Sequence, residues 1–418
     1  MQKASQLIKQ TTTNFLADKL RRRSLLCKDM GKRFFIFKSD VDARADSVAC
    51  FDIFWMCWKL MGIAVNSKKW YITLYDISVN IFVNIYYPIH LTIGLFLVPT
   101  VADVLKNLTI NITDVACSTK HFLFRCKLPK IREIQRLLKE LDERVVAPDE
   151  RNYFNTGIRN VVRRIMLIFC ASYAADVVAS AIEVLTKKER ELRYPAWFPF
   201  DWSANRYTYY AAVLYQTVGV SLQITQNLAH DTFAPVSLCV MAGQVRLLGM
   251  RVSKVGYDMS KTLIEHERDL NECIEDHKKL LKIFDLLQDV FWYTQLVQFS
   301  SVGLNICLTA VLMLLFVDNL FTYIYYTAYF CSMAVELLPA CYYGSKMQEE
   351  FQNLPYAIFK CNWIGQRKSF QQNLRIFTEL SKKQFTPTAG GIINIHLTSF
   401  MATCKMAYSL YTVLMNMK

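Results

Sequence analysis

Long apolar runs are the feature that most constrains the fold of this chain. A helix that crosses a bilayer needs about 20 mostly apolar residues. Five runs meet the requirement plainly: residues 70–98, 165–185, 207–232, 290–317 and 320–343. A sixth run, residues 391–415, is more polar than these five. A seventh, residues 104–126, carries several charged side chains.

Composition agrees with a membrane protein. Hydrophobic residues make up 53% of the 418 residues and charged residues 20%, against about 45–50% and about 25% in soluble domains. The mean hydropathy of +0.17 is nevertheless lower than a bundle made only of spans would give. We therefore expect substantial polar structure outside the lipid.

The distribution of basic residues predicts the topology, because cytosolic segments of membrane proteins are rich in Lys and Arg. Of the 49 Lys and Arg, 40 lie in residues 1–69, 125–164, 244–283 and 344–390. These segments share one side only if the weak run 104–126 also spans. The sequence predicts an all-α membrane protein with seven transmembrane helices, a cytosolic N-terminus and an extracellular C-terminus, which is the reverse of a G-protein-coupled receptor.

The cytosolic segments have their own helical pattern, with apolar residues at helical spacing among charged ones. They either form a self-contained bundle or serve as an oligomerisation platform, and the sequence favours neither. The stripes are Ile131, Ile134, Leu137, Leu138, Leu141 and Val145; Leu270, Ile274, Leu281 and Phe284; and Phe370, Leu374, Phe377 and Leu380.

This pattern predicts the following organisation. We expect a cytosolic N-terminal segment with a re-entrant or pre-span helix over 1–69. Spans one to six follow over 70–343, with cytosolic extensions at 127–160 and 244–289. Cytosolic anchor helices occupy 344–390, and the seventh span, which lines the pore, occupies 391–418.

Motifs for catalysis or cofactor binding are missing from the sequence. There is no G-x-S-x-G, no H-E-x-x-H and no Walker A glycine loop, so we expect no enzyme, no cofactor and no metal site. His266 and His277 lie among charged residues and are expected on a solvated helix face. The net charge of +14 is explained by topology rather than by nucleic acid, since no nucleic-acid-binding motif accompanies it.

Polar residues inside the predicted spans are costly, so each is a functional hypothesis. We interpret most of them as hydrogen-bond partners between helices and expect Lys405 to pair with a carboxylate. The possible glycosylation sites at Asn107 and Asn111 begin the second span, and burial there would prevent their modification. The ionisable set is Asp76, Asp114, Asp176, Glu183, Asp231, Glu336 and Lys405.

The last span differs from the others by a polar stripe along one side. The stripe is either a seam packed against another helix or the wall of a water-filled path, which would solvate it. Its members are Asn394, Thr398, Lys405, Ser409, Thr412 and Asn416.

Four segments together resemble the insect odorant receptors: an outer-loop YPAWFPFDW at 194–202, HDTF at 230–233, expected as a turn within span four, LLPACYYGSKMQEE at 337–350, and the tail FTPTAGGIINIHLTSFMATCKMAYSLYTVLMN at 385–416. The resemblance implies a tetrameric, odour-gated, non-selective cation channel in the plasma membrane of olfactory sensory dendrites. It also implies a small volatile odorant as ligand, membrane lipid around the spans and a co-receptor as partner in a heteromeric tetramer.

The type of subunit follows from a missing insertion. The co-receptor of that family carries a long insertion between spans four and five, whereas residues 243–282 carry none, so the chain resembles a fly-type tuning subunit. A gustatory-type cation channel is the nearest alternative. A G-protein-coupled receptor or a transporter is the alternative from a different class, although the D-R-Y and N-P-x-x-Y motifs of the former are missing.

The resemblance also implies site residues. It places gate residues at Val413 and Met417 with Asn416 beside them, and the polar stripe adds Ser409 and Thr412 on the wetted face. It places an odorant pocket in the outer halves of spans two, three, four and six. The candidates there are Ile112, Tyr173, Val177, Ala181, Tyr209, Ala212, Gln216, Tyr323, Tyr326 and Phe330.

Overall fold

The computed structural model describes residues 44–63, 70–186, 192, 194–316 and 320–417. Most of the expected N-terminal segment therefore lies outside the described residues, as do Asp318 and Asn319, the expected turn between spans five and six. The helices described here belong to one compact unit that begins at Ala45.

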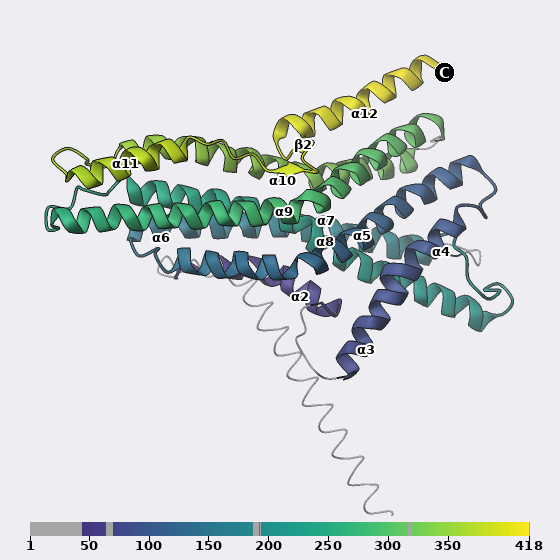
Figure 1. Cartoon of the computed structure of the whole chain (residues 1–418). Coiled ribbons are helices and arrows are strands. Elements are labelled where there is room, and N and C mark those ends of the chain that lie inside the picture. The colour runs from purple at the N-terminus through teal and green to yellow at the C-terminus, as the bar shows by residue number, and fades with distance from the viewer. Residues whose placement is uncertain (1–43, 64–69, 187–191, 193, 317–319, 418) are drawn as a thin grey trace, which may run out of the picture. The chain divides into compact units, whose positions relative to one another are not determined.

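This unit is almost entirely helical (Figure 1). The elements in chain order are η1 (Val48–Phe51), α2 (Asp52–Leu60), α3 (Trp70–Val79), the π-helix η2 (Asn80–Tyr86), α4 (Tyr87–Gly94), α5 (Val101–Asp142), α6 (Pro148–Tyr153), the π-helix η3 (Phe154–Arg159), α7 (Asn160–Thr186), α8 (Arg206–Val252), α9 (Leu263–Leu315), α10 (Leu320–Phe359), α11 (Lys368–Ser381), β1 (Thr388–Ala389), β2 (Ile393–Asn394) and α12 (Leu397–Met417).

Local sequence explains where three of the longest helices begin. The Thr100 hydroxyl accepts a hydrogen bond from the Asp103 amide at the start of α5. Asn205 and Thr208 form a capping box at the start of α8. Thr262 and Glu265 do the same for α9. Each cap satisfies amide groups that the first turn of a helix leaves without a partner.

Four helices are much longer than a membrane is thick. α5, α8, α9 and α10 contain 42, 47, 53 and 40 residues, which corresponds to about 60–80 Å at 1.5 Å per residue, against a bilayer core of about 30 Å. Two of them, α8 and α9, are long and apolar enough to cross a membrane by length and composition. The expected HDTF turn is wrong: residues 230–233 continue α8, which also includes Pro235.

An aromatic core joins the N-terminal helix to the long helices. Phe54 of α2 stacks on Phe233 of α8 with ring centroids 4.8 Å apart, and Trp58 meets Phe124 of α5 at 5.6 Å. All four rings are buried. Burial of rings of this size is a large hydrophobic contribution, so α2 is fixed against α5 and α8.

We call the part formed by α6, α11 and residues 127–142, 244–252, 263–289 and 344–359 of the long helices the inner bundle. In Figure 1, α9 runs beside α5 and α11 there. Every member of the predicted stripe from Ile131 to Val145 is buried, as are Phe370, Leu374 and Phe377. The stripe from Ile131 to Val145 is thus covered within one chain, whereas Leu380, the last member of the stripe on α11, is 56% exposed.

Two expectations for the inner bundle are wrong. His266 and His277 are buried rather than solvated, since His266 bonds to the Asp258 carbonyl and to Gln366 and the His277 ring packs on Phe377. The stripe on α9 is also shifted by a residue in places. Leu281 and Phe284 are half-buried, and the buried residues are Leu270, Cys273, Leu280, Ile283 and Leu287.

The helix of the predicted seventh span begins later in the chain than the sequence predicts. The expected helix from residue 391 begins at Leu397 instead, because residues 388–394 form a two-stranded hairpin in which Thr388 pairs with Asn394 and Ala389 with Ile393. Gly390 and Gly391 turn it at φ +61° and +68°, a region that favours glycine. Asn394 therefore does not belong to the helical polar stripe.

Candidate functional site

The helices expected to line a pocket do meet. α8 packs against α5, α7 and α10, and α7 also contacts α10. These contacts are close, since α8 is buried continuously from Ala229 to Val245. The four helices on which all ten pocket candidates lie are therefore adjacent.

The candidates differ in exposure. Tyr173 and Tyr326 are buried, whereas Ile112, Tyr209 and Phe330 are half-buried. Tyr323 is 52% exposed in the single chain, as expected of a side chain that faces lipid or a partner. The side chains of Val177 and Ala181 lie outside the described residues.

Two candidates are occupied by packing against the outer loop. The Gln216 amide donates to the Tyr194 carbonyl at 2.9 Å, and the Gln216 carbonyl accepts from the Tyr87 hydroxyl at 3.3 Å. Ala212 belongs to a buried cluster with Tyr87 and Leu91 of α4. The side-chain amide of Gln216, a pocket candidate, is thus already hydrogen-bonded within the chain.

The outer loop folds back over three helices rather than extending outward. The Trp197 amide donates to the His90 carbonyl of α4 at 3.0 Å, and the Asn107 amide of α5 donates to the Pro195 carbonyl at 3.0 Å. Gly94 makes this approach possible, since an added Cβ would lie 2.3 Å from the Pro195 oxygen. Asn107 and Asn111 are both buried, which explains why glycosylation is not expected.

Most of the described ionisable residues do bond to other helices. Asp76 forms a bidentate pair with Arg125 of α5 at 2.7 and 2.5 Å. Asp231 accepts from Lys120 at 2.5 Å, and Glu336 accepts from Gln298 at 3.2 Å. Asp114 is buried, and its Oδ2 has no partner among the described residues. The side chains of Asp176 and Glu183 lie outside them.

The hairpin before α12 is fixed to α9. The Gln288 amide donates to the Thr388 carbonyl and accepts from the Thr388 amide, at 2.8 and 2.9 Å, and the Gly390 amide donates to the Trp292 carbonyl at 2.7 Å. An added Cβ at Gly391 would lie 2.5 Å from the Trp292 ring. The first residue of α12, Leu397, donates to the Ser345 hydroxyl of α10.

Beyond this anchor, α12 presents much of its surface. Val413 is 54% exposed, Ser409 is exposed, and the Thr412 hydroxyl bonds back to the Ser409 carbonyl at 2.9 Å. The side chains of Asn416 and Met417 lie outside the described residues. Lys405 is exposed, and no ion pair joins it to a carboxylate among the described residues, so its pairing stays a prediction.

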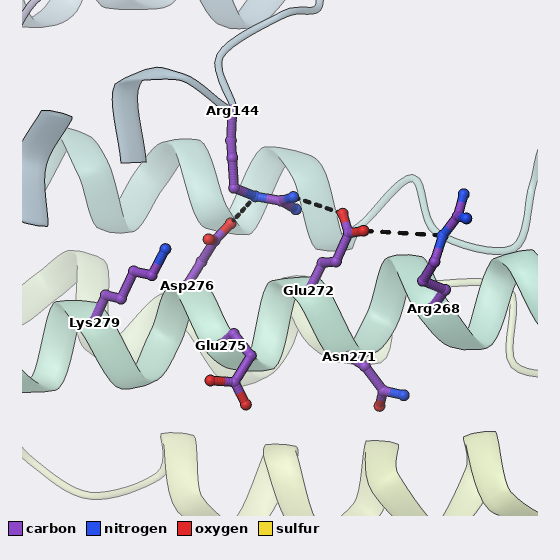
Figure 2. Close-up of a pocket in the computed structure, with 7 residues that line it drawn as sticks. All are labelled: Arg144, Arg268, Asn271, Glu272, Glu275, Asp276 and Lys279. Atoms are coloured by element: carbon purple, nitrogen blue, oxygen red, sulfur yellow. Dashed lines mark hydrogen bonds and ion pairs between the residues drawn. The ribbon is translucent and has the colours of Figure 1, made fainter. Parts of the chain in front are cut away.

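A hollow of about 260 Å³ lies on the inner bundle and is unsuited to an odorant (Figure 2). Its wall is charged, and a volatile apolar molecule gains little from such a wall. Arg144 bonds to Asp276 at 2.5 Å and to Glu272 at 2.6 Å. The lining residues are Arg144, Arg268, Asn271, Glu272, Glu275, Asp276 and Lys279.

These ion pairs continue into a buried network behind the hollow. Arg251 of α8 donates to Asp276 at 2.8 Å and to Glu150 of α6 at 2.9 Å. Glu150 and Asp276 are almost completely buried. The network joins α6, α8, α9 and the end of α5, so its evident role is to hold the inner bundle together.

Comparison with known proteins decides the family. The family model described as 7tm Odorant receptor matches residues 100–408. The chain belongs to the odorant receptor family. Odorant receptor 33b of Drosophila melanogaster is 41% identical over 87% of this chain and 96% of its own length, and Odorant receptor 59a of the same species is 35% identical over 90% and 99%.

Solved structures give the same fold at low sequence identity. The insect olfactory receptor OR5 from Machilis hrabei superposes with a TM-score of 0.74 and 14% identity, covering 87% of this chain and 97% of that one. Its complex with eugenol superposes with a TM-score of 0.73. The fold of an insect olfactory receptor is therefore shared.

Family membership selects among the earlier alternatives. Odorant receptors are membrane proteins and receptor channels rather than enzymes. Within the family, this chain is a tuning receptor rather than the co-receptor. The gustatory, G-protein-coupled and transporter alternatives are set aside.

Sequence reasoning missed several residues of this site. Gln288 and Trp292, which hold the hairpin, lie in an ordinary amphipathic stretch, and no local signal marks them. The Gly390-Gly391 pair did carry a signal, since consecutive glycines indicate a turn.

Proposed function

We propose that this odorant receptor is the odorant-binding subunit of a ligand-gated, non-selective cation channel with seven spans, a cytosolic N-terminus and an extracellular C-terminus. It binds a small volatile molecule among α5, α7, α8 and α10 and assembles with a co-receptor into a heteromeric tetramer in the dendritic membrane of olfactory sensory neurons. The OR5 complex with eugenol, a volatile phenol, supports ligand binding in this fold.

The observation that carries the proposal is the state of α12. Its start is fixed to α9 and α10 by the hairpin, while Lys405, Ser409 and Val413 beyond it are exposed in the single chain. Hydroxyl groups on one side of a helix need water or polar partners in a membrane. A pore shared by several subunits provides both water and neighbours for α12.

The gate follows from the side chains that the resemblance places at the narrow point. Apolar Val413 and Met417 can block ions by excluding water, and exposure of Asn416 on opening would offer a polar contact without strong charge selectivity. The thioether of Met417 is flexible, so Val413 is expected to dominate closure. Exposed Lys405 fits a wide part of the path, where its repulsion of cations is screened.

Cysteine substitution in co-expressed channels tests the pore. Cysteine replaces Ser409, Thr412, Val413, Asn416 or Met417 in turn, and a water-soluble thiol reagent is applied with and without odorant. Odorant-dependent modification of the current should follow the helical phase. Equal modification of the controls Phe400→Cys and Leu414→Cys, or modification of none of the five, would refute a pore-lining α12.

Assembly is proposed through the inner bundle, around residues 245–284 and 370–385. The stripe of α5 is covered within the chain, so it leaves no surface for a partner. Five apolar side chains on or beside the inner bundle, Leu380 of the α11 stripe among them, remain exposed and supply a more direct surface for a neighbouring subunit. They are Tyr257, Met259, Ile264, Ile376 and Leu380.

Expression with and without a co-receptor is the decisive functional experiment. Patch-clamp recording should detect cation currents on application of volatile alcohols, esters or ketones only when both chains are present. Large currents from this chain alone would contradict the need for a co-receptor. Epitope tags test the topology in the same cells, where an N-terminal tag accessible from outside would refute it.

A further inference from the structure

Five polar side chains meet in the interior of the long-helix bundle, one from each of five helices. Lys120 of α5 donates to Asp231 of α8 at 2.5 Å and to Gln298 of α9 at 2.6 Å. Tyr173 of α7 donates to the other oxygen of Asp231 at 2.5 Å. Gln298 donates to Glu336 of α10 at 3.2 Å. We call these five residues the Lys120 cluster.

Burying the cluster costs free energy that helix packing alone does not require. The side chains of Lys120 and Asp231 are 5% and 2% exposed, and removing two charges from water costs several kcal/mol per ion before their attraction is counted. Apolar residues would hold the same helices together at no such cost. A buried pair of this kind is best explained by a specific arrangement that it enforces.

The helices of the cluster belong to two overlapping sets. α5, α7, α8 and α10 carry all the pocket candidates, and one of those candidates, Tyr173, is itself a cluster member. α9 and α10 are the helices against which α12 packs. The bond from Lys120 of α5 to Gln298 of α9 joins the first set to the second, and Gln298 extends it to Glu336 of α10, a helix of both sets.

A second arrangement of the cluster has partners ready. His121 directly follows Lys120 in the sequence, and His230 directly precedes Asp231. Both histidines are buried, and their ring centroids lie 6.0 Å apart. Neither ring nitrogen of either histidine has a hydrogen-bond partner among the described residues. Buried polar atoms without partners are costly, so a small shift of α5 against α8 could exchange one set of bonds for another.

We propose that the Lys120 cluster is a positioning unit that couples occupancy of the odorant pocket to the α9–α10 pair that holds α12. Tyr173 is its contact with the pocket: its ring borders the ligand, while its hydroxyl is held by Asp231. This inference rests on the proposed channel function and adds the route by which binding changes gating. A ligand can shift the equilibrium between two arrangements only if it binds them differently, and a ligand that moves the Tyr173 ring does so.

Removal of the Tyr173 hydroxyl tests the unit, in channels co-expressed with the co-receptor. Tyr173→Phe keeps the ring and breaks its bond to Asp231. The concentration for half-maximal current should change by about tenfold, the size expected for one hydrogen bond to a charged group. The change should be the same for every active ester, alcohol and ketone, so that their rank order is kept. Tyr207→Phe, at an 89% exposed tyrosine, is the matched control and should change nothing.

A double-mutant cycle separates the cluster from a structural effect. Asp231→Leu combined with Tyr173→Phe should shift the half-maximal concentration no further than Asp231→Leu alone, because Asp231→Leu removes both acceptor oxygens and so breaks the same bond. Lys120→Arg keeps the charge and should retain most of the coupling that Lys120→Met loses. Surface labelling of every variant normalises the currents, so a folding defect is recognised separately.

Each outcome decides between distinct failures. If the unmodified chain gives no odorant current with the co-receptor, the proposed function fails. If it conducts and Tyr173→Phe changes the rank order of odorants, Tyr173 acts by contact with ligand and the coupling role is overturned. If it conducts and Tyr173→Phe changes no odorant response, or the two effects add in the cycle, the cluster does not couple pocket to pore.

Discussion

The inner bundle and α12 differ in how far their side chains find partners within the single chain. In the inner bundle most members of the predicted apolar stripes are buried or half-buried, and charges such as Arg251, Glu150 and Asp276 are paired within one chain. α12 is held at its first residues, and Lys405 and Val413 beyond them are exposed. The interior of the inner bundle is therefore satisfied within a single chain, whereas α12 leaves both a charged and an apolar side chain uncovered. Interior ion pairs stabilise the first region, and one hairpin positions the second.

The largest effect should come from the network of the inner bundle. Arg251→Met leaves buried Glu150 without its pair and removes one of two arginines from Asp276, which should cost about 3–5 kcal/mol. Thermal unfolding of the purified receptor and surface labelling in cells measure this. Lys254→Met breaks an exposed pair with Asp149 and should cost less than about 1 kcal/mol. Equal losses from the two variants would remove the distinction between buried and exposed pairs.

The hairpin should rank next. Gly391→Ala adds a Cβ 2.5 Å from the Trp292 ring at a φ of +68°, and the strain and overpacking together should cost about 3 kcal/mol. Because the hairpin positions α12, odorant currents should fall while the inner bundle keeps its unfolding temperature. Gly365→Ala has a similar φ of +75° with nothing within 4 Å and should leave currents intact. Normal currents from Gly391→Ala would show that the turn does not position the helix.

Acid should destabilise the inner bundle through His277. Burial lowers the pKa of His277 from 6.5 to about 4, so below pH 6.5 the unfolded chain binds a proton that the folded chain excludes. Stability should fall by about 2 kcal/mol from this residue between pH 7 and 5. His277→Phe should make the measured loss smaller. A pH dependence unchanged by His277→Phe would contradict this assignment.

Asp142 provides a control of opposite sign. Burial raises its pKa from 3.8 to about 6, despite hydrogen bonds from Ser47 and Gln244. The folded chain therefore keeps a proton that the unfolded chain releases, and this contribution to stability is lost as pH rises through about 6. Asp142→Asn should make the acid loss larger, not smaller.

The smallest effect on stability should come from α12. Val413→Thr preserves the shape of an exposed side chain and should change the free energy of unfolding by less than about 0.5 kcal/mol. The added hydroxyl should nevertheless raise the current without odorant, because it weakens an apolar gate. Met401→Leu, also on an exposed part of α12, should change neither quantity. Unchanged resting current in Val413→Thr would argue against Val413 as the gate.

The sequence predicts the long helices well and their ends poorly. Apolar run length placed residues 207–232 inside α8 and most of residues 290–317 inside α9, because a run long enough to cross a bilayer is a property of the local sequence alone. The start of α12 was missed, since residues 388–394 form a hairpin only against Gln288 and Trp292, which are about 100 residues earlier. The prediction of a turn at HDTF was wrong, because α8 continues through residues 230–233 and also through Pro235, within its buried length.

Site residues were predicted unevenly for the same reason. Helical phase between spans is a tertiary property, so Tyr173 and Ala212 were chosen alike although one bonds to Asp231 and the other packs under the outer loop. The burial of His266 and His277 was missed because their charged sequence neighbours suggested a solvated face. Their partners are Gln366, in the loop before α11, and Phe377 of α11. Both lie about 100 residues later in the chain and cannot be predicted from the local pattern.

The position of the hairpin also has a consequence for biosynthesis. Chains are made from the N-terminus, and earlier segments fold while later ones are still being synthesised. Residues 397–417 leave the ribosome after the site that receives their hairpin, on Gln288 and Trp292 of α9, which is made about 100 residues earlier. α12 therefore arrives at a surface that has already been synthesised, so its position can be set as soon as its hairpin emerges.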